Sequence, residues 1–431
     1  MNFLKKQSPV RIISLGFALV ILIGSVLLSL PCSIRDGVTL RYIDALYMST
    51  SAVCVTGLLT VDAGDTFTPL GQFFLGMLIQ VGGLGVTAVG TGVILAMGKK
   101  INLKARNLIR EAGNLDSGKG VIRFIRLVFL TTVTFELAGA ALSFLVFRKS
   151  FPPLKAAGVS LFHSVASFNN SGFDILGGGQ NLIPYQDDIL LNLVTCALVI
   201  FGGIGFLVIR EVIAKRFRWK KLSMHAKVVL FMSLVLTAAG TVLLKLTEDI
   251  TWMGAFFTSV SARTAGFSTF SLGSFSSAGL LTVIVLMVIG ASPGSTGGGI
   301  KTTTCYVLFE GIRSSATNTS EKAFRYAVPA DAFRKAAVIT LLAIGIVLSG
   351  TYILVILEPG VPFLDALFEM SSAFGTAGLS TGISAGLCDA AKILTILIMF
   401  IGRLGPLTIA SLWYFTKGER VSYPEGNIAI G

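Results

Sequence analysis

The 431-residue chain has little charge: Asp, Glu, Lys and Arg make up 13% of it, against 53% hydrophobic residues. A soluble protein of this length exposes far more charge, so the composition excludes that class and indicates a membrane protein. There are two histidines and five scattered cysteines without a CxxC pair, which argues against a disulfide framework or a zinc site. No nucleophile and base are spaced as in a catalytic site, and we expect that the chain is not an enzyme.

The net charge of +13 is distributed unevenly. Basic residues gather in connectors between apolar runs, at residues 99–123, 210–227 and 301–335, as in short cytoplasmic loops. No nucleic-acid-binding motif accompanies them. We therefore place these connectors and both termini in the cytoplasm. Most acidic residues then fall on the outer face, where they either concentrate cations near the pore or are simply the polar residues that any exposed loop contains. They are Asp36, Asp44, Asp62, Asp65, Asp174, Asp187, Asp188, Glu248, Asp249, Glu358, Asp365, Glu369 and Asp389.

Eight apolar runs have the length of about 20 residues that a membrane-spanning helix needs. They are Ile12–Leu30, Leu70–Met97, Phe124–Val146, Ile189–Ile213, Val228–Leu246, Leu280–Leu308, Ala337–Leu357 and Ile393–Phe415. Shorter helical segments lie between the members of each successive pair: Tyr42–Ser51, Ala157–Ala166, Trp252–Val260 and Phe363–Ser372. They are too short to span, so we expect re-entrant helices.

A glycine motif follows each short segment. The glycine is followed by Leu or Phe, is preceded by Thr, Ser or Ala, and has an aromatic residue ten positions upstream (Tyr47, Phe162, Phe256, Phe368). The sequence therefore predicts an all-α polytopic membrane protein with eight transmembrane helices, four re-entrant pore helices and a pseudo-fourfold pore. Its four repeats comprise residues 1–98, 99–218, 219–310 (with a broken second helix) and 311–431, the last including the C-terminal tail.

Irregular backbone inside a membrane is costly unless it is buried in protein or lines water. Four such loops around one axis could present backbone carbonyls that replace the hydration shell of a monovalent cation. The alternative is tight helix packing through small residues. The candidate filter residues, at which we expect a potassium ion to bind, are Cys54, Val55, Thr56, Gly57, Asn169, Asn170, Ser171, Gly172, Arg263, Thr264, Ala265, Gly266, Gly375, Thr376, Ala377 and Gly378. Since Arg263 would repel cations at the axis, we expect it behind the filter, bracing loop carbonyls.

A glycine-rich stretch interrupts the sixth run. It resembles a phosphate-binding P-loop, but its spacing differs and it follows a membrane helix instead of a strand. We expect a flexible segment that obstructs the pore and can swing aside; a static kink is the alternative. The candidate gate residues are Gly290, Ser292, Pro293, Gly294, Ser295, Thr296, Gly297, Gly298, Gly299, Lys301 and Arg403.

Arg403 is a charge inside the last apolar run, and intramembrane charges are rare and usually functional. At the pore it would form an electrostatic barrier to cations. A structural salt bridge is the alternative, with Glu136 as a candidate partner.

The second loop (Phe168–Phe173), the third loop (Arg263–Phe267) and the string Pro293–Lys301 resemble the Trk/Ktr/HKT superfamily of potassium uptake proteins over essentially the whole chain. The TrkH branch carries additional N-terminal helices, whereas this chain begins directly with the first repeat. The resemblance is therefore greatest to the KtrB-type membrane subunits of bacterial Ktr systems.

The resemblance implies potassium uptake across the bacterial plasma membrane by a multi-pass homodimer with one pore per subunit. It also implies a cytoplasmic ring of KtrA-type RCK subunits that binds ATP or ADP, stimulation by sodium, and no organic cofactor in this chain. Gly57, Gly172, Gly266 and Gly378 would line the filter, and Arg403 would face the pore beneath it. The basic loops would dock the ring or contact lipid headgroups.

Two other readings remain. A cation-coupled secondary transporter with alternating access also uses broken helices, although it usually binds substrate at helix ends. The potassium-binding subunit of an ATP-driven pump has a related fold but would be expected to carry extra helices. Channel-like flux that saturates only at high concentration would separate the first reading from alternating access.

Overall fold

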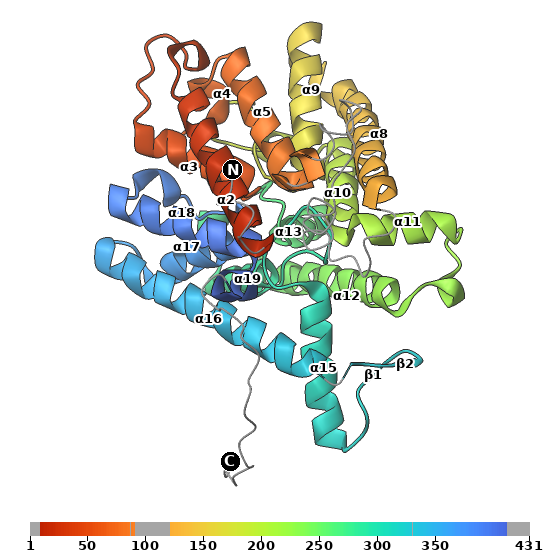
Figure 1. Ribbon diagram of the computed structural model, residues 1–431. Helices are drawn as coiled ribbons and strands as arrows, with labels where there is room; N and C mark the ends of the chain where they lie inside the picture. The colour runs from red at the N-terminus through yellow and green to blue at the C-terminus, as the bar shows by residue number, and fades with distance from the viewer. Residues whose placement is uncertain (1–8, 87, 91–120, 330, 412–431) are drawn as a thin grey trace, which may run out of the picture.

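The structure is a computed structural model that describes residues 9–86, 88–90, 121–329 and 331–411. It is mostly helical, as predicted. Figure 1 shows successive groups of helices arranged around a central region, from red through yellow and green to blue. Among the described residues, each group contains a long helix, a short buried helix that ends in a loop, and a helix that is interrupted.

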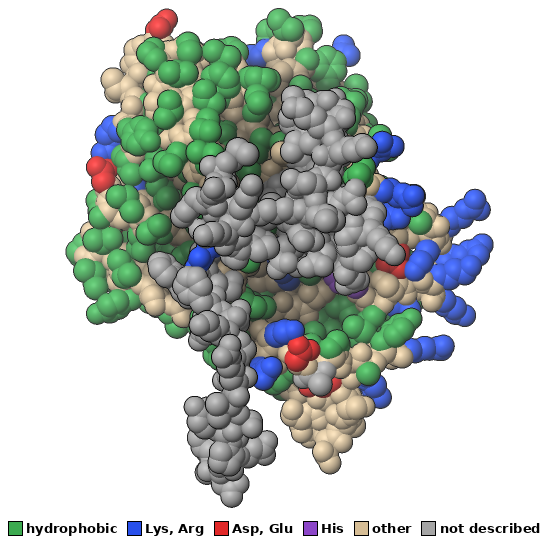
Figure 2. All heavy atoms as spheres, viewed as in Figure 1, with side chains coloured by type: hydrophobic (Ala, Val, Ile, Leu, Met, Phe, Trp, Pro, Cys, Tyr) green, Lys and Arg blue, Asp and Glu red, His purple; other side chains and the backbone are tan. Residues whose placement is uncertain are grey.

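The long helices are α2 (Pro9–Leu28), α8 (Val121–Phe147), α12 (Met224–Thr247) and α16 (Ala332–Leu357). Within the described part of the chain, only these four are long and apolar enough to cross a membrane singly. They expose large aliphatic side chains such as Leu19, Leu130 and Leu341. Figure 2 shows a largely hydrophobic surface over α2, α3 and α5. Lipid covers such a surface as well as protein would.

The short helices are α3 (Tyr42–Val53), α9 (Pro153–Phe168), α13 (Trp252–Ala262) and α17 (Phe363–Gly375). They coincide with the predicted re-entrant segments, extended by a few residues at their ends. The last two turns of each are buried. Their C-terminal ends therefore meet in the interior of the molecule, surrounded by the longer helices.

The interrupted helices correct one prediction. Runs expected to be continuous helices end at glycines: α5 (Pro69–Leu84) ends at Gly85, α10 (Ile189–Ile204) at Gly205 and α18 (Asp389–Leu404) at Gly405. These glycines have φ values of 86°, 90° and 90°, which an α-helix cannot contain. After Gly205 the chain continues as α11 (Phe206–Ala214), at 98° to α10, and after Gly405 as α19 (Pro406–Ser411). The predicted ends of the second and eighth runs, residues 91–97 and 412–415, lie outside the described residues.

The fourth interrupted helix breaks where the sequence predicts. α14 (Ser277–Val288) ends before the glycine-rich loop, residues 289–301, and α15 (Thr302–Thr317) follows it. Polar side chains cap the starts of three interrupted helices: Thr68, Asp188 and Ser276 accept hydrogen bonds from backbone amides three residues on. These caps fix where each helix begins.

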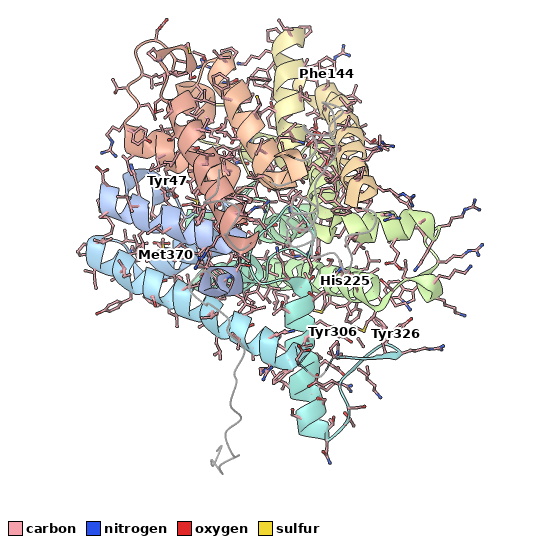
Figure 3. All side chains as sticks on the ribbon, viewed as in Figure 1. Tyr47, Phe144, His225, Tyr306, Tyr326 and Met370 are labelled. Atoms are coloured by element: carbon pink, nitrogen blue, oxygen red, sulfur yellow. The ribbon has the colours of Figure 1, made fainter. Side chains whose placement is uncertain are left out.

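α15 extends away from the helical ring toward a small hairpin of β1 (Lys322–Ala323) and β2 (Tyr326–Ala327) (Figure 1). Figure 3 labels Tyr326 in this hairpin and Tyr306 on α15, and Lys227 Nζ is 5.9 Å from the Tyr326 ring centroid. Lys and Arg side chains project from the end of the molecule that α11 occupies (Figure 2).

The remaining short elements are α4 (Ala63–Thr66), η1 (Pro31–Ser33), η2 (Ile183–Tyr185), η3 (Trp219–Lys221), η4 (Leu272–Ser274) and η5 (Ser384–Gly386). The basic residues at 99–120 lie outside the described part.

Candidate functional site

All four buried helices end in loops of the same backbone conformation. Each motif glycine has a positive φ: 97° at Gly57, 69° at Gly172, 76° at Gly266 and 80° at Gly378. The residue two positions earlier also has a positive φ, at Val55, Asn170, Thr264 and Thr376. Such values are uncommon outside glycine, and for β-branched residues they are strained. Local strain of this kind persists only where surrounding structure enforces it, and it often marks a functional site.

Hydrogen bonds to the preceding helix hold these loops. The amides of Thr56, Ser171 and Ala377 donate to carbonyls five residues back, at 2.7, 2.9 and 2.9 Å. This is the 6→1 bond of a Schellman-type helix end. In the third loop, Ala265 N donates to Ser261 O at 2.8 Å. The helix ends therefore dictate the path of the chain into each loop.

The structure brings the four glycines together, and we call Gly57, Gly172, Gly266 and Gly378 the glycine ring. A Cβ built on Gly172 would lie 2.8 Å from Gly266 Cα, and one on Gly266 would lie 3.2 Å from Gly378 Cα. One on Gly378 would lie 2.8 Å from Gly57 Cα, and one on Gly57 would lie 3.2 Å from Gly172 Cα. The glycines thus follow one another around a closed ring in chain order, at separations that exclude any side chain.

The candidate filter side chains point to different surroundings. Asn169 donates to Gln80 Oε1 at 2.8 Å and to Glu136 Oε1 at 3.0 Å, while Asn170 hydrogen-bonds Thr264 at 3.1 Å. In the first loop, Cys54, Val55 and Thr56 are fully buried. Side chains of the second loop therefore brace it against neighbouring helices and the third loop.

Arg263 lies behind its loop, as expected, but it does not brace loop carbonyls. Its guanidinium donates to Ser233 O at 2.9 Å and to Thr237 Oγ1 at 3.2 Å, both on α12. It therefore anchors the third loop to the neighbouring long helix. His163, on the second buried helix, has its Nε2 2.9 Å from Thr195 Oγ1.

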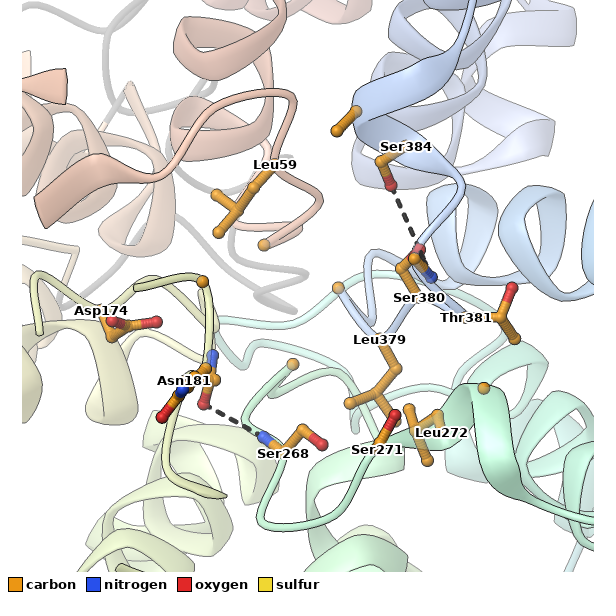
Figure 4. Close-up of a pocket in the computed structure, with 18 of the residues that line it drawn as sticks. Leu59, Asp174, Asn181, Ser268, Ser271, Leu272, Leu379, Ser380, Thr381 and Ser384 are labelled. Atoms are coloured by element: carbon orange, nitrogen blue, oxygen red, sulfur yellow. Dashed lines mark hydrogen bonds between the residues drawn. The ribbon is translucent and has the colours of Figure 1, made fainter. Parts of the chain in front are cut away.

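A cavity of about 370 Å³ lies outside the glycine ring. Gly57, Gly266 and Gly378 form part of its wall, together with polar groups of the following segments (Figure 4). Asp174 is one of these groups and is 7% exposed. Burial raises its pKa to about 7; a hydrogen bond from the Leu176 amide opposes this shift, and the nearby Asp62 and Asp65 add to it. The cavity thus carries a carboxyl group that changes charge near neutral pH.

The glycine-rich loop is tied to the ends of the neighbouring repeats. Ser292 N donates to Gly203 O at 3.0 Å, Thr296 N to Gly202 O at 3.2 Å, and Gly298 N to Thr376 Oγ1 at 3.0 Å. Lys301 Nζ donates to Gly297 O at 2.7 Å.

The other predicted gate residues also lie in this loop. Gly294 O accepts from Phe206 N at 3.1 Å, and Ser295 Oγ donates to Ser292 O at 2.6 Å. Gly290 lies against Gly298 and Gly299, and Pro293 O lies near Gly205. The loop therefore packs directly beneath the second and fourth glycine loops.

Arg403, at the end of α18, reaches this loop. Its guanidinium donates to Thr296 O and to the carbonyls of Gly82 and Gly83 at the end of α5. No ion pair joins Arg403 to Glu136 among the described residues; the Glu136 carboxylate accepts from Asn169 instead. The predicted structural alternative, a salt bridge with Glu136, is therefore wrong. Arg403 instead joins the first repeat, the fourth repeat and the glycine-rich loop.

The sequence reading missed a buried ion pair. Lys392 Nζ lies 2.6 Å from Asp44 Oδ1, and the Lys392 and Asp44 side chains are 3% and 9% exposed. Arg41 pairs with Asp389 beside it, at 3.0 Å. These contacts fasten α18 to α3, so they connect the last repeat to the first. The available signal was a lone lysine directly before an apolar run.

Comparison with known proteins identifies the family to which this chain belongs. Residues 10–416 match the family model TrkH, described as cation transport protein. The chain belongs to the TrkH family. It is 36% identical to Ktr system potassium uptake protein B of Bacillus subtilis, over 98% of this chain and 97% of the relative. It is 35% identical to the potassium/sodium uptake protein NtpJ of Enterococcus hirae, over 99% and 98%.

The crystal structure of the potassium transporter TrkH from Vibrio parahaemolyticus superposes with a TM-score of 0.75, at 19% identity, over 95% of this chain and 86% of that one. At this identity the likeness establishes the fold. As a TrkH-family member with several apolar spanning helices, the chain is a multi-pass plasma-membrane transport protein and not an enzyme.

Proposed function

We propose that this chain takes up potassium by conducting the ion through the glycine ring. The observation that carries the proposal is the convergence of four glycines, each with a positive φ at itself and at the residue two positions earlier. Residues with positive φ alternate with residues of ordinary φ in these loops. This alternation turns successive backbone carbonyls toward one side, which favours coordination of a cation by carbonyl oxygens. The four buried helices also direct the negative ends of their dipoles toward the ring.

Three further features support this role. The cavity outside the ring offers a water-accessible entrance with an acidic group, Asp174, in its wall. Thr56 Oγ1 is buried next to the ring without a hydrogen-bond partner among the described residues, so it is available to an ion. Relatives over nearly the full length are named as potassium or potassium/sodium uptake proteins.

In this proposal the glycine-rich loop is the gate. Its bonds to Gly202, Gly203 and Thr376 keep it beneath the ring, and Arg403 both fastens it and places a positive charge there. Phe206, the first residue of α11, donates to Gly294 O at 3.1 Å. A partner that moves α11 would therefore pull directly on the loop.

We propose that this partner is a cytoplasmic KtrA-type RCK ring that binds ATP or ADP, as the family resemblance implies. The Ktr system names of two relatives support the existence of a partner subunit. The basic side chains that follow α11, from Lys215 through Lys221 of η3, offer it a docking surface (Figure 2). We further propose a homodimer, with sodium as a stimulating ion. Both proposals rest on the family resemblance.

The test is uptake of K⁺ and Na⁺ into proteoliposomes that contain this chain alone. Gly266→Ser should abolish the preference for K⁺, because its Cβ would lie 2.8 Å from Ala377 O and 3.0 Å from Gly172 Cα. Gly158→Ser is the matched control: it lies in α9, where a Cβ would meet nothing within 4 Å. Wild-type flux without K⁺ preference, or a selective Gly266→Ser variant, would overturn the filter assignment. Saturation of flux at low concentration would favour alternating access instead.

A further inference from the structure

A buried carboxylate, Glu369 of α17, lies behind the fourth glycine loop and has no part in the proposed conduction path. Its side chain is fully buried. Its Oε2 accepts a hydrogen bond from Ser380 Oγ at 2.8 Å, and its Oε1 accepts one from Ser384 Oγ. No lysine or arginine in the described part of the chain pairs with it. A buried charge without a counter-charge is costly, so its presence needs a reason.

The two serines connect Glu369 to the cavity outside the glycine ring. Ser380 follows Gly378 by two residues, and both serines line that cavity (Figure 4). Ser380 Oγ also accepts from Gly382 N at 3.0 Å, which leaves its single hydroxyl hydrogen for Glu369. Both serine hydroxyls are placed to donate to the carboxyl group, an arrangement that favours its ionised form. It holds the segment that follows Gly378.

This carboxylate is particular to the fourth repeat. The corresponding residue, one after the shared aromatic, is Met48 in the first repeat, His163 in the second and Phe257 in the third. Among the described residues, the other titratable groups that interact with Glu369 are Asp365 on its own helix and Tyr47 on α3. Neither carries a positive charge, so the protein side chains around Glu369 do not neutralise it.

We propose that Glu369 sets the affinity of the glycine ring for its cation, with the bound ion supplying the missing counter-charge. Inside a low-dielectric protein, a negative charge at this position attracts a cation in the ring more strongly than it would in water. Glu369 acts on the ion through its electrostatic field and through the loop that it holds. It is therefore a positioning residue. The inference rests on the proposed function, because it takes the glycine ring as the cation site.

The test is K⁺ binding to the purified full-length chain by titration calorimetry, combined with uptake in proteoliposomes. Glu369→Gln and Glu369→Met both remove the charge, and each should weaken K⁺ binding by about fivefold or more. The K⁺ concentration for half-maximal uptake should rise by the same factor, whereas maximal uptake should change less. Glu369→Asp keeps the charge and should retain most of the affinity. The matched control is Glu358→Gln, because Glu358 also accepts a hydrogen bond in the fourth repeat, from Cys388 N at 2.6 Å.

The outcomes separate this inference from the proposed function. If Glu369→Gln binds K⁺ as the wild type does while Gly266→Ser loses selectivity, the ring remains the filter and the role of Glu369 is refuted. If Glu369→Asp loses as much affinity as Glu369→Gln, shape and not charge is responsible, and the inference again fails. A wild-type chain that neither binds nor takes up K⁺ overturns the proposed function itself. Two charge-free variants are included so that poor folding of one leaves the other to decide.

Discussion

Replacing Arg403 with glutamine should open the pathway. Arg403 donates to Thr296 O in the glycine-rich loop and to the carbonyls of Gly82 and Gly83, so one side chain joins the loop to two helix ends. Glutamine is shorter and neutral, and it can replace one of these bonds at most. The loop would then be held mainly by its backbone bonds to the second repeat and by Thr376.

The magnitude follows from the bonds that are lost. A hydrogen bond from a charged donor contributes about 1.5–3 kcal/mol net, and a neutral one about 1 kcal/mol. Loss of the link between Arg403 and the loop should therefore favour the open loop by about 2 kcal/mol, which is about 30-fold in the ratio of open to closed states. Removal of the positive charge also lowers the electrostatic barrier to a cation, so both effects raise flux.

The assay is the initial rate of K⁺ uptake into proteoliposomes with equal amounts of folded protein. Arg403→Gln should exceed the wild type by about an order of magnitude. Lys335→Gln is the control, because it removes a basic charge that pairs with Asp331 in an exposed ion pair. An Arg403→Gln protein that folds normally and conducts more slowly would refute both the fastening and the barrier.

Four other expectations can be tested. Deletion of Gly294–Gly298 should raise K⁺ uptake at least as much as Arg403→Gln does, and unchanged uptake would make the loop a static kink. Because the pKa of Asp174 is raised to about 7, this group gains its charge as external pH rises through neutrality; half-saturating K⁺ should fall between pH 6 and pH 8, and Asp174→Asn should abolish that dependence. The same shift makes the folded state lose stability as pH rises from the ordinary pKa of about 3.8 through 7, so Asp174→Asn should unfold at a higher temperature than the wild type at pH 8. Lys392→Met should cost about 3–5 kcal/mol in thermal unfolding by leaving Asp44 buried and unpaired, and adding Asp44→Asn should restore part of it; an unchanged unfolding temperature would show that the pair is not needed.

The sequence was sufficient to predict the loops because their requirement is local. A positive φ next to a close backbone neighbour selects glycine, and that selection leaves the same residue at Gly57, Gly172, Gly266 and Gly378. The length of the preceding apolar segments likewise predicts helices too short to span. Four copies of such a unit predict a shared axis, and the structure brings the four glycines together.

The breaks in the other interrupted helices were missed for a physical reason. Hydropathy registers only whether a residue favours lipid, and a run of apolar residues has the same hydropathy whether or not it contains one residue with positive φ. A signal was nevertheless present. Gly82–Gly85, Gly202–Gly205 and Gly402–Gly405 each have glycine at both ends and Leu or Ile third, at corresponding places in three repeats.

Contacts between distant parts of the chain were beyond a single sequence. Arg403 and Gly82 are 321 positions apart, and Lys392 and Asp44 are 348 apart. Both pairs join the last repeat to the first, so they exist only because the ring of helices closes. The charge of Arg403 marked it as a candidate functional residue, but its partners depend on that closure, which is why Glu136 was a wrong candidate.

The same closure gives a physical basis for the proposed gate in the third repeat. Gly82, Gly202 and Gly402 press against the carbonyls of Val53, Phe168 and Phe374, so any side chain there would collide with the end of a pore helix. Contacts this close between backbones cannot loosen without separating whole helices. In the third repeat, a polar loop takes the place of such a contact and is held by individual hydrogen bonds, each worth about 1 kcal/mol and replaceable by water. If three rigid contacts and one weak one are the basis of gating, Gly202→Ala should destabilise the fold, whereas changes within the loop should alter flux and leave the unfolding temperature nearly unchanged.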